Sequence, residues 1–293
     1  MKLQGKRVII TGATGGLGAQ AMSQLKKKGA QVIGIDKKPF ENGSSEDIII
    51  ADIREESAIA KAMKEAIDRL GGLDILINNA GVLELQDPAD PLDRFVREHV
   101  EVHLYGTMRV TSLALPALLE SGGRVINVAS LFAVVNAPFI YPYSSTKRGI
   151  SGYSDILRIQ YRGQLKVATV YPGFMDTPIH DSAVAQGLSV KRIITFYIGK
   201  RKLIALDEPV PQAARGLVRI CRKRRIRDHG LTFMGGISLR AAKLMPRFVD
   251  GFINWRIGQL IRKGALSIEL NKGKTTAADS IGFNPEESPL APA

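Results

Sequence analysis

The chain has 293 residues, of which 45% are hydrophobic and 24% are charged, and both fractions are ordinary for a globular protein with a full core of its own. Cys221 is its one cysteine, so no intrachain disulfide can form, and we expect a reducing, cytoplasmic compartment. We expect no signal peptide before the first strand and no transmembrane helix, because the sequence has no apolar run of about 18 residues.

The formal net charge is +13, and it is concentrated in the C-terminal third. Between Lys191 and Lys263 there are 18 Lys and Arg but only four Asp and Glu, whereas the rest of the chain is nearly balanced. This asymmetry predicts a basic surface feature attached to an otherwise neutral domain.

The first 180 residues alternate short β-branched runs with longer helical patterns. The expected strands are Lys6–Thr11, Gln31–Ile35, Asp47–Ala51, Asp74–Ile77, Arg124–Val128 and Lys166–Tyr171. The expected helices between them are Gly16–Lys28, Glu55–Leu70, Leu92–Leu119 and Tyr143–Arg162. Strands that alternate with long helices predict an α/β fold with a doubly wound, Rossmann-like parallel sheet.

The pattern loosens after Pro172. We expect a lid over about 174–202, a helix over Pro209–Arg225 and a last strand at Leu231–Met234. The predicted division is a single Rossmann-like domain over 1–235, a basic amphipathic helical extension over 236–270 and a disordered tail over 271–293.

A glycine-rich turn follows the first expected strand and opens the first helix. It reads Thr-Gly-Ala-Thr-Gly-Gly-Leu-Gly, so the residues expected to bind a cofactor here are Gly12, Thr14, Gly16, Leu17 and Gly18. Glycine lets the backbone turn sharply and approach a pyrophosphate closely, and the helix N-terminus offers free N–H groups to that anion. The turn therefore predicts a dinucleotide site.

Asp36 ends the second expected strand, 18 residues after Gly18. A carboxylate there can accept hydrogen bonds from both ribose hydroxyls of NAD and would repel the 2′-phosphate of NADP. Lys37 and Lys38 follow and could partly neutralise that repulsion. NAD is the expected cofactor, with NADP as the alternative.

The glycine spacing, together with four later segments in order, resembles the short-chain dehydrogenase/reductase family. The segments are Asp52-Ile53, Asn79-Ala80-Gly81 within an Asn-Asn-Ala-Gly run, the Tyr143-x-x-x-Lys147 motif, and Pro172-Gly173 with Thr177. The resemblance spans roughly residues 5–180. It implies that Asp52 and Ile53 contact adenine, that the loop at Asn79, Ala80 and Gly81 lies beside the cofactor, and that Thr177 holds the nicotinamide carboxamide.

Tyr143 and Lys147 are four residues apart on a helix and so project from one face. A free tyrosine has a pKa of about 10, and a neighbouring ammonium group lowers it, so Tyr143 can act as a general acid or base. Ser130 lies just past a strand end, where its hydroxyl can bind the substrate oxygen. The expected catalytic residues are Ser130, Tyr143 and Lys147, and no metal is expected.

The sequence departs from the family pattern at His103, which stands where an asparagine of the long helix normally supports a proton relay. Imidazole can accept and pass a proton, so one hypothesis gives His103 a catalytic relay role. The alternative is a packed histidine.

The C-terminal third carries the cluster Arg222-Lys223-Arg224-Arg225-Ile226-Arg227, followed by apolar residues at roughly helical spacing from Phe248 to Ile261. An interfacial helix on an anionic membrane and a face that docks on the core or on a second copy both remain open. Nucleic acid is not expected.

These features predict an NAD(H)-dependent enzyme that interconverts an alcohol and its carbonyl. Apolar residues of the expected lid favour a hydrophobic substrate of steroid, retinoid or lipid type. The alternative is a dinucleotide-binding sensor or scaffold with little turnover. The family resemblance implies a homodimer or homotetramer.

Overall fold

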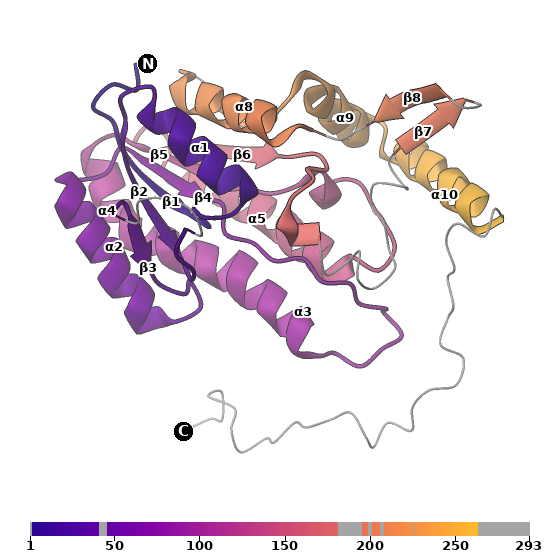
Figure 1. Cartoon of the computed structure of the whole chain (residues 1–293), viewed down its shortest axis with the longest axis horizontal. Coiled ribbons are helices and arrows are strands. Elements are labelled where there is room, and N and C mark those ends of the chain that lie inside the picture. Colours follow the sequence, from indigo (N-terminus) through magenta and orange to yellow (C-terminus); the bar gives the residue numbers. More distant parts are fainter. Residues whose placement is uncertain are drawn as a thin grey trace.

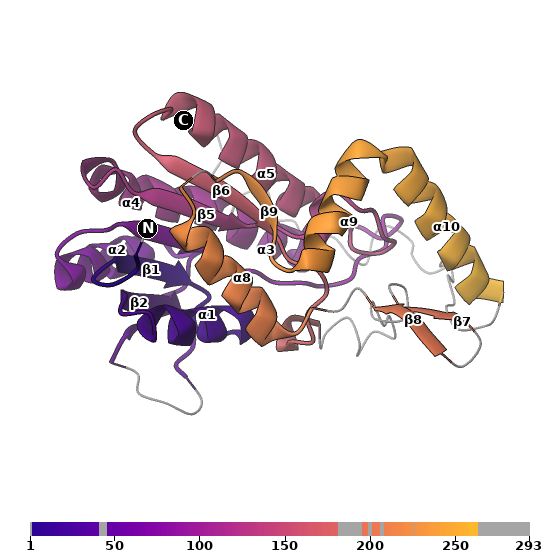
Figure 2. The same cartoon turned by 90° about the horizontal axis from the view of Figure 1, so that it is seen from above.

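The computed structural model describes residues 2–40, 46–180, 195–198, 201–205, 208–224 and 226–262. Within them, seven parallel strands form one sheet in the order β3-β2-β1-β4-β5-β6-β9 (Figure 1; β9 is labelled in Figure 2). The strands are β1 Arg7–Thr11, β2 Gln31–Asp36, β3 Ile48–Ile50, β4 Ile75–Asn78, β5 Arg124–Val128, β6 Lys166–Tyr171 and β9 Asp228–Gly230. The doubly wound α/β fold predicted from the sequence is confirmed.

Helices cover both faces of this sheet (Figures 1 and 2). One face carries α1 Gly16–Lys26 and α8 Val210–Arg222, and the other carries α2 Glu56–Leu70, α4 Thr107–Glu120 and α5 Tyr141–Gln160. Successive residues of a strand point to opposite faces. Val8 and Ile10 accordingly lie in the core under α1 and α8, whereas Ile9 lies in the core under α2 and α4.

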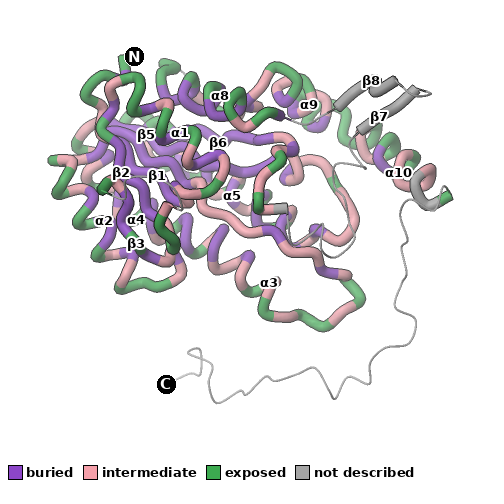
Figure 3. The backbone as a smooth tube through the Cα atoms, viewed as in Figure 1, coloured by how far each residue is buried: buried purple, intermediate pink, exposed green. Residues whose placement is uncertain are grey.

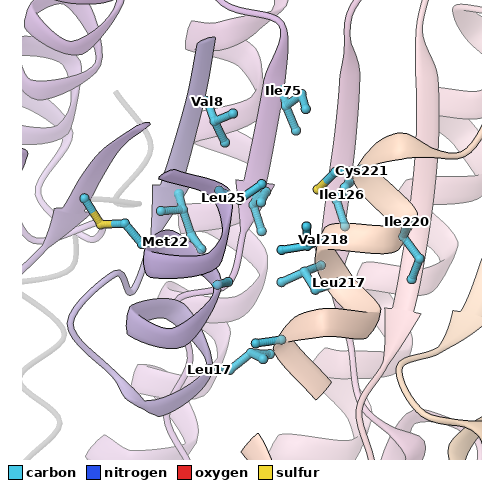
Figure 4. Close-up of a cluster of buried hydrophobic side chains, with 14 of the residues drawn as sticks. Val8, Leu17, Met22, Leu25, Ile75, Ile126, Leu217, Val218, Ile220 and Cys221 are labelled. Atoms are coloured by element: carbon cyan, nitrogen blue, oxygen red, sulfur yellow. The ribbon is translucent and has the colours of Figure 1, made fainter. Parts of the chain in front are cut away.

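The α1 and α8 helices pack side by side although nearly 200 residues separate them. Figure 4 shows Leu17 and Leu25 of α1 and Leu217 and Val218 of α8 in one cluster with the apolar side chains of β1, β4 and β5. Cys221 is fully buried in the same cluster. The helix predicted over Pro209–Arg225 is therefore part of the core domain rather than of a detached extension.

The expected long helix over Leu92–Leu119 is a helical run with a change of winding in its middle. It comprises α3 Arg94–His99, a π-helical turn Val100–Gly106 and α4. Asp93 begins it as an N-cap, because its Oδ1 accepts hydrogen bonds from the backbone N–H groups of Phe95 (2.8 Å) and Val96 (3.2 Å). Such π-turns are frequent at functional sites.

The strand predicted at Leu231–Met234 is wrong in position. The last strand of the sheet is β9, and α9 Phe233–Leu244 begins where the strand was expected to end. Thr232 decides this, because its Oγ1 accepts a hydrogen bond from the backbone N–H of Gly235 (3.0 Å) and so caps the helix.

After α9, α10 Pro246–Arg262 extends away from the sheet, near the hairpin of β7 Thr195–Ile198 and β8 Arg201–Ala205 (Figure 2). Helical structure of the expected extension is thus seen as far as Arg262, and the expected tail over 271–293 lies outside the described residues. The domain boundary at 235 stays a prediction, although α9 runs across it. Among the described helices, none has the length and hydropathy that crossing a membrane requires.

A buried polar chain ties the central strands to α4 and α5. The Asn78 Nδ2 donates to Asn127 Oδ1 (2.8 Å) and to Thr111 Oγ1 (2.9 Å), and the Asn127 Nδ2 donates to Ser154 Oγ (2.9 Å). All four side chains are buried, so their polar groups have no access to bulk water. These hydrogen bonds hold α5, the helix that carries Tyr143, against the sheet.

We expect Asn127→Ala to lower the free energy of unfolding by about 2–3 kcal/mol, because the buried Asn78 Nδ2 and Ser154 Oγ each lose one hydrogen-bond partner that water cannot replace. Denaturant unfolding followed by circular dichroism measures this. The control is Lys61→Ala on the exposed face of α2, which should change stability by no more than about 0.5 kcal/mol. Equal stabilities of the two variants would contradict a structural role for the chain.

Candidate active site

A cavity of about 550 Å³ opens at the carboxyl ends of β1, β4, β5 and β6. The strand order reverses between β1 and β4, and such switch points are where open α/β sheets bind ligands. The expected site residues on its lining are Gly12, Thr14, Gly16, Leu17, Asp36, Asp52, Ile53, Asn79, Ala80, Gly81, Ser130, Tyr143, Lys147, Pro172, Gly173 and Thr177. Of the expected site residues, Gly18 and His103 are not on the lining.

The glycine-rich turn has glycines where other residues would collide. Gly12 has φ +64°, and a Cβ there would lie 2.8 Å from the Cα of Ala80. At Gly18 a Cβ would lie 2.1 Å from the carbonyl oxygen of Gly12. Gly18 therefore permits the helix to pack under the turn, whereas Gly12 and Gly16 belong to the cavity surface.

The loop after β4 holds this turn in place. The Asn79 Nδ2 donates to the carbonyl oxygens of Thr11 (3.1 Å) and Gly12 (3.0 Å). In return, Thr11 Oγ1 accepts from the backbone N–H groups of Asn79 (3.1 Å) and Ala80 (3.2 Å). The two loops thus fix one another, and the amino end of α1 faces the cavity with no acidic residue in its first turn.

At the end expected to bind adenosine, Asp36 is half-buried and its carboxylate accepts hydrogen bonds from the backbone N–H groups of Thr14 (2.9 Å) and Lys38 (3.3 Å). The Lys37 Nζ lies 3.9 Å from a Glu98 carboxylate oxygen. Both lysines line the cavity, but the ion pair of Lys37 is with Glu98 rather than with Asp36.

Sequence reasoning missed Arg54, which pairs with Asp52 at 2.7 Å and with Glu98 at 3.2 Å. The hydrogen bond from Arg54 outweighs burial and holds the pKa of Asp52 below its usual value. Arg54 directly follows the Asp52-Ile53 pair in the sequence. That position could have identified it, since an acidic residue at a ligand site often has a cationic partner nearby.

Tyr143 and Lys147 lie on the same face of α5, as predicted, and both are buried. The Lys147 Nζ lies 5.6 Å from the ring centroid of Tyr143 and donates a hydrogen bond to the carbonyl oxygen of Val128 (3.0 Å). Burial lowers the pKa of Lys147 to about 7.

The pKa of Tyr143 is shifted opposite to the direction expected from its spacing to Lys147. Burial raises this pKa, and a hydrogen bond with Ser130 opposes the rise. The physical reason is that the buried surroundings disfavour the charged form of each group, and the ammonium that should favour the phenolate is itself destabilised. In the protein alone, burial therefore favours the neutral form of Tyr143 and makes Lys147 easier to deprotonate than a free lysine.

His103 lies in the π-helical turn, fully buried, with its ring centroid 5.4 Å from that of Tyr143. Its Nε2 accepts a hydrogen bond from the backbone N–H of Val82 (3.1 Å), and its Nδ1 lies 2.8 Å from Thr146 Oγ1. Both ring nitrogens are engaged, which favours the packed alternative, and the relay role stays a prediction. A second buried histidine, His99, lies one helical turn earlier and was missed because no motif marks it.

Apolar side chains line the cavity beside Tyr143. They come from the segment after β4, from the turn after β5 and from the start of the expected lid, and they are Val82, Leu83, Phe132, Phe174, Met175 and Ile179. Most of the lid expected over 174–202 lies outside the described residues, and so do most of the apolar residues that favoured a hydrophobic substrate. Among the described residues, there is no group of His, Cys, Asp and Glu that could hold a metal ion.

Comparison with known proteins gives the family of this chain. A family model described as short chain dehydrogenase matches residues 6–187. Oxidoreductase UcpA of Escherichia coli K12 is 30% identical over 197 residues, which cover 63% of this chain and 75% of that protein. The 3-ketodihydrosphingosine reductase of Bacteroides thetaiotaomicron is 28% identical over 187 residues, which cover 61% of this chain and 68% of that protein.

Solved structures agree on the fold. The chain is similar to a short chain dehydrogenase from Burkholderia cenocepacia J2315, crystallised in complex with NADP, with a TM-score of 0.69 and 23% identity. That match covers 86% of this chain and 99% of the other.

Proposed function

Because the chain belongs to the short-chain dehydrogenase family, and is thus an oxidoreductase that acts on CH–OH groups with a nicotinamide dinucleotide, we propose that it uses NAD(H) to interconvert a hydrophobic alcohol and its carbonyl. The observation that supports this most directly is the meeting of Ser130, Tyr143 and Lys147 in one cavity that also contains the glycine-rich turn.

The residues present fit a dinucleotide. A Cβ at Gly12 or Gly16 would lie 2.8 Å from Ala80 or 2.6 Å from Thr177, so these glycines keep open a narrow cradle between three loops. The amino end of α1 offers N–H groups to a pyrophosphate there. Asp36 would accept ribose hydroxyls, while Asn79, Ala80 and Gly81 form the wall beside the cofactor and Thr177 would bind its carboxamide.

When bound, the nicotinamide supplies the carbon that gives or receives a hydride. In oxidation the Tyr143 phenolate oxygen takes the proton of the alcohol and becomes the hydroxyl, and in reduction the Tyr143 hydroxyl donates that proton to the carbonyl oxygen. Ser130 donates a hydrogen bond to that oxygen and stabilises its developing charge. Lys147, when protonated, favours the Tyr143 phenolate and so lowers the cost of the proton transfer.

The apolar lining supports a hydrophobic substrate. Leu83, Ile140 and Tyr143 form one buried cluster, against which Phe132 and Ile179 pack. A ketone carried on an alkyl or ring system would bury apolar surface here, whereas a polyol would leave its hydroxyls without partners. One relative is named for such a lipid ketone, 3-ketodihydrosphingosine.

We expect Tyr143→Phe to reduce kcat at least 1,000-fold, because no other residue would supply the proton, while NADH binding stays within threefold. Turnover on a panel of hydrophobic and polyhydroxylated alcohols and ketones, with NADH binding followed by nicotinamide fluorescence, measures this. Tyr141→Phe is the matched control, since that residue is on the same helix but not on the cavity lining.

Two results would contradict the proposal. Equal turnover by Tyr143→Phe and wild type would remove Tyr143 from the chemistry, and preferred turnover of polyols would remove the hydrophobic substrate. NADH binding without turnover on any compound would favour the alternative of a dinucleotide-binding sensor.

The preference for NAD rests on Asp36, whose carboxylate faces the cavity at the end of β2. A 2′-phosphate in that place would meet this carboxylate, although the cations of Lys37 and Lys38 also line the cavity. We expect wild type to bind NADH at least tenfold more tightly than NADPH. Asp36→Ala should weaken NADH and strengthen NADPH, so that the ratio of the two dissociation constants falls at least tenfold. Fluorescence titration of both cofactors checks this, and an unchanged ratio would assign the selectivity to another residue.

A self-associated state is also part of the proposal. Exposed apolar side chains lie on two neighbouring helical segments, namely Tyr105 in the π-helical turn, Met108 on α4, and Ile156 and Ile159 on α5. A homodimer or homotetramer that pairs these helices would cover them.

We further propose that the protein attaches peripherally to the cytoplasmic face of an anionic membrane through α10. Phe248, Phe252 and Trp255 recur at helical spacing and are 66%, 41% and 52% exposed. The rings of Phe252 and Trp255 stack with their centroids 5.8 Å apart. Exposed aromatic side chains on a helix that also carries the exposed Arg247 and Arg262 fit an interface with anionic lipid.

The position of α10 suits delivery of a hydrophobic substrate. Its Asp250 accepts a hydrogen bond from Asn136 (3.0 Å), in the loop that follows Ser130. Figure 3 shows exposed segments of α10 at the outer end of the molecule, beyond the sheet. A membrane at this face would lie near the cavity side of the molecule.

Trp255 is the one tryptophan of the chain, so it reports this contact directly. We expect its emission to shift to the blue with vesicles containing phosphatidylglycerol and not with pure phosphatidylcholine. Phe248→Ser with Phe252→Ser should weaken vesicle binding at least tenfold, whereas Ile50→Ser with Leu92→Ser, exposed apolar residues elsewhere, should not. An unshifted emission with a larger mass in light scattering would assign the face to a second copy of the chain.

A further inference from the structure

Two buried histidines lie one helical turn apart on the wall behind the cavity. His99 ends α3 and His103 lies in the π-helical turn, and neither side chain reaches solvent. Their ring centroids are 5.5 Å apart, and the ring of His103 meets the ring of Tyr143 edge-on. Neither histidine lines the cavity, so both act on it only through neighbours.

Both Nε2 atoms accept hydrogen bonds from the backbone. Val82 N–H donates to His103 at 3.1 Å, and Glu84 N–H donates to His99 at 3.3 Å. The two imidazoles, four residues apart on the helical run, thus bind two backbone N–H groups that are two residues apart on the segment after β4.

The Nδ1 atoms are engaged as donors. His99 Nδ1 lies 2.6 Å from the carbonyl oxygen of Phe95, which can only accept. His103 Nδ1 lies 2.8 Å from Thr146 Oγ1, whose own proton goes to the carbonyl oxygen of Pro142 (2.8 Å) or Tyr143 (3.0 Å). With Nε2 accepting and Nδ1 donating, each ring is neutral and held in one tautomer.

These bonds connect two walls of the cavity. Gly81, Val82, Leu83 and Glu84 line it on one side, and Tyr143 and Lys147 line it on the other. The path from Val82 through His103 and Thr146 to the first turn of α5 joins them. A Cβ on Gly81 would lie 3.2 Å from His103 Nε2 and 3.3 Å from Lys147 Nζ, so the fit is close.

We infer that His99 and His103 are positioning residues, which as neutral hydrogen-bond acceptors clamp the segment Gly81–Glu84 and thereby fix the cofactor wall relative to Tyr143. The kinetic part of this inference rests on the proposed function. The clamp itself is a property of the folded chain and can be tested without turnover.

A clamp of this kind fails in acid, because a protonated imidazole presents N–H to N–H. Burial lowers the pKa of both histidines, as does the cation of Lys147 on α5, and for His103 also a charge on His99. Glu98 and Asp93 oppose the shift at His99 only. Since the folded-state pKa values lie below the unfolded value of 6.5, the clamp's contribution to stability is complete above about pH 6.5 and is lost progressively as the pH falls below it.

The test compares His103→Leu, which removes the acceptor, with His103→Gln, whose amide oxygen can replace Nε2 but does not titrate. Amide hydrogen exchange at pH 8 should show at least tenfold less protection of the Val82 N–H in His103→Leu, and restored protection in His103→Gln. His99→Leu and His99→Gln should do the same at Glu84. Steady-state kinetics should show kcat reduced at least tenfold by His103→Leu and largely recovered by His103→Gln. The acid limb of the kcat profile should also be shallower in His103→Gln than in wild type.

Three outcomes would overturn the clamp. The first is unchanged protection of Val82 and Glu84 in the leucine variants. The second is an acid limb in His103→Gln identical to that of wild type. The third is loss of kcat in His103→Gln at pH 8 with full protection of Val82, which would assign His103 to proton relay instead. If no substrate is turned over at all, the proposed function fails, and the exchange data still decide the clamp.

Discussion

The site depends on the hydrogen bonds that join two loops at the switch point of the sheet. The side chains of Thr11 and Asn79 make four hydrogen bonds to the backbone of the opposite loop, at Asn79 and Ala80 and at Thr11 and Gly12, and these hold the glycine-rich turn after β1 against the loop after β4. With that distance fixed, only glycine fits at position 12, and the amino end of α1 is presented to the cavity. The shape of the dinucleotide cradle is thus determined by these two loops and does not depend on the catalytic side chains.

A second constraint is that the buried site disfavours charge on its ionisable side chains. Lys147, Tyr143, His99 and His103 are buried within one cluster, and their pKa values are all shifted toward the neutral form. Burial is the main cause in each case, so a charge that appears at one of them raises the free energy of a charge of the same sign at the next. The histidines remain uncharged acceptors, and Lys147 is left as the group whose protonation changes near neutral pH.

The basic C-terminal third divides between two roles. α8 is an integral layer of the domain, because its apolar face packs on α1 and its end is held by Arg124, which donates hydrogen bonds to the carbonyl oxygens of Cys221 (2.7 Å) and Lys223 (3.0 Å). α10 instead leaves Phe248, Phe252 and Trp255 largely exposed. The basic residues of the C-terminal third therefore belong to two different elements. One is a helix of the core domain, and the other is a helix whose aromatic side chains are exposed.

Local patterns determined most of the fold and the identity of the site. Each of these patterns lies within one short segment of the chain. The β-branched runs predict the strands, the glycine spacing from Gly12 to Gly18 predicts the turn, and the four-residue separation of Tyr143 and Lys147 predicts their shared helix face. Contacts between distant segments decided the rest. Three features arise where the segment after β4, the π-helical turn and α5 contact one another in the interior. They are the π-helical turn itself, the hydrogen bonds of His99 and His103 to the segment after β4, and the raised pKa of Tyr143. Burial and partners of that kind are properties of the assembled chain, so the sequence marked His103 as unusual, but only the tertiary structure showed which atoms its ring nitrogens bind.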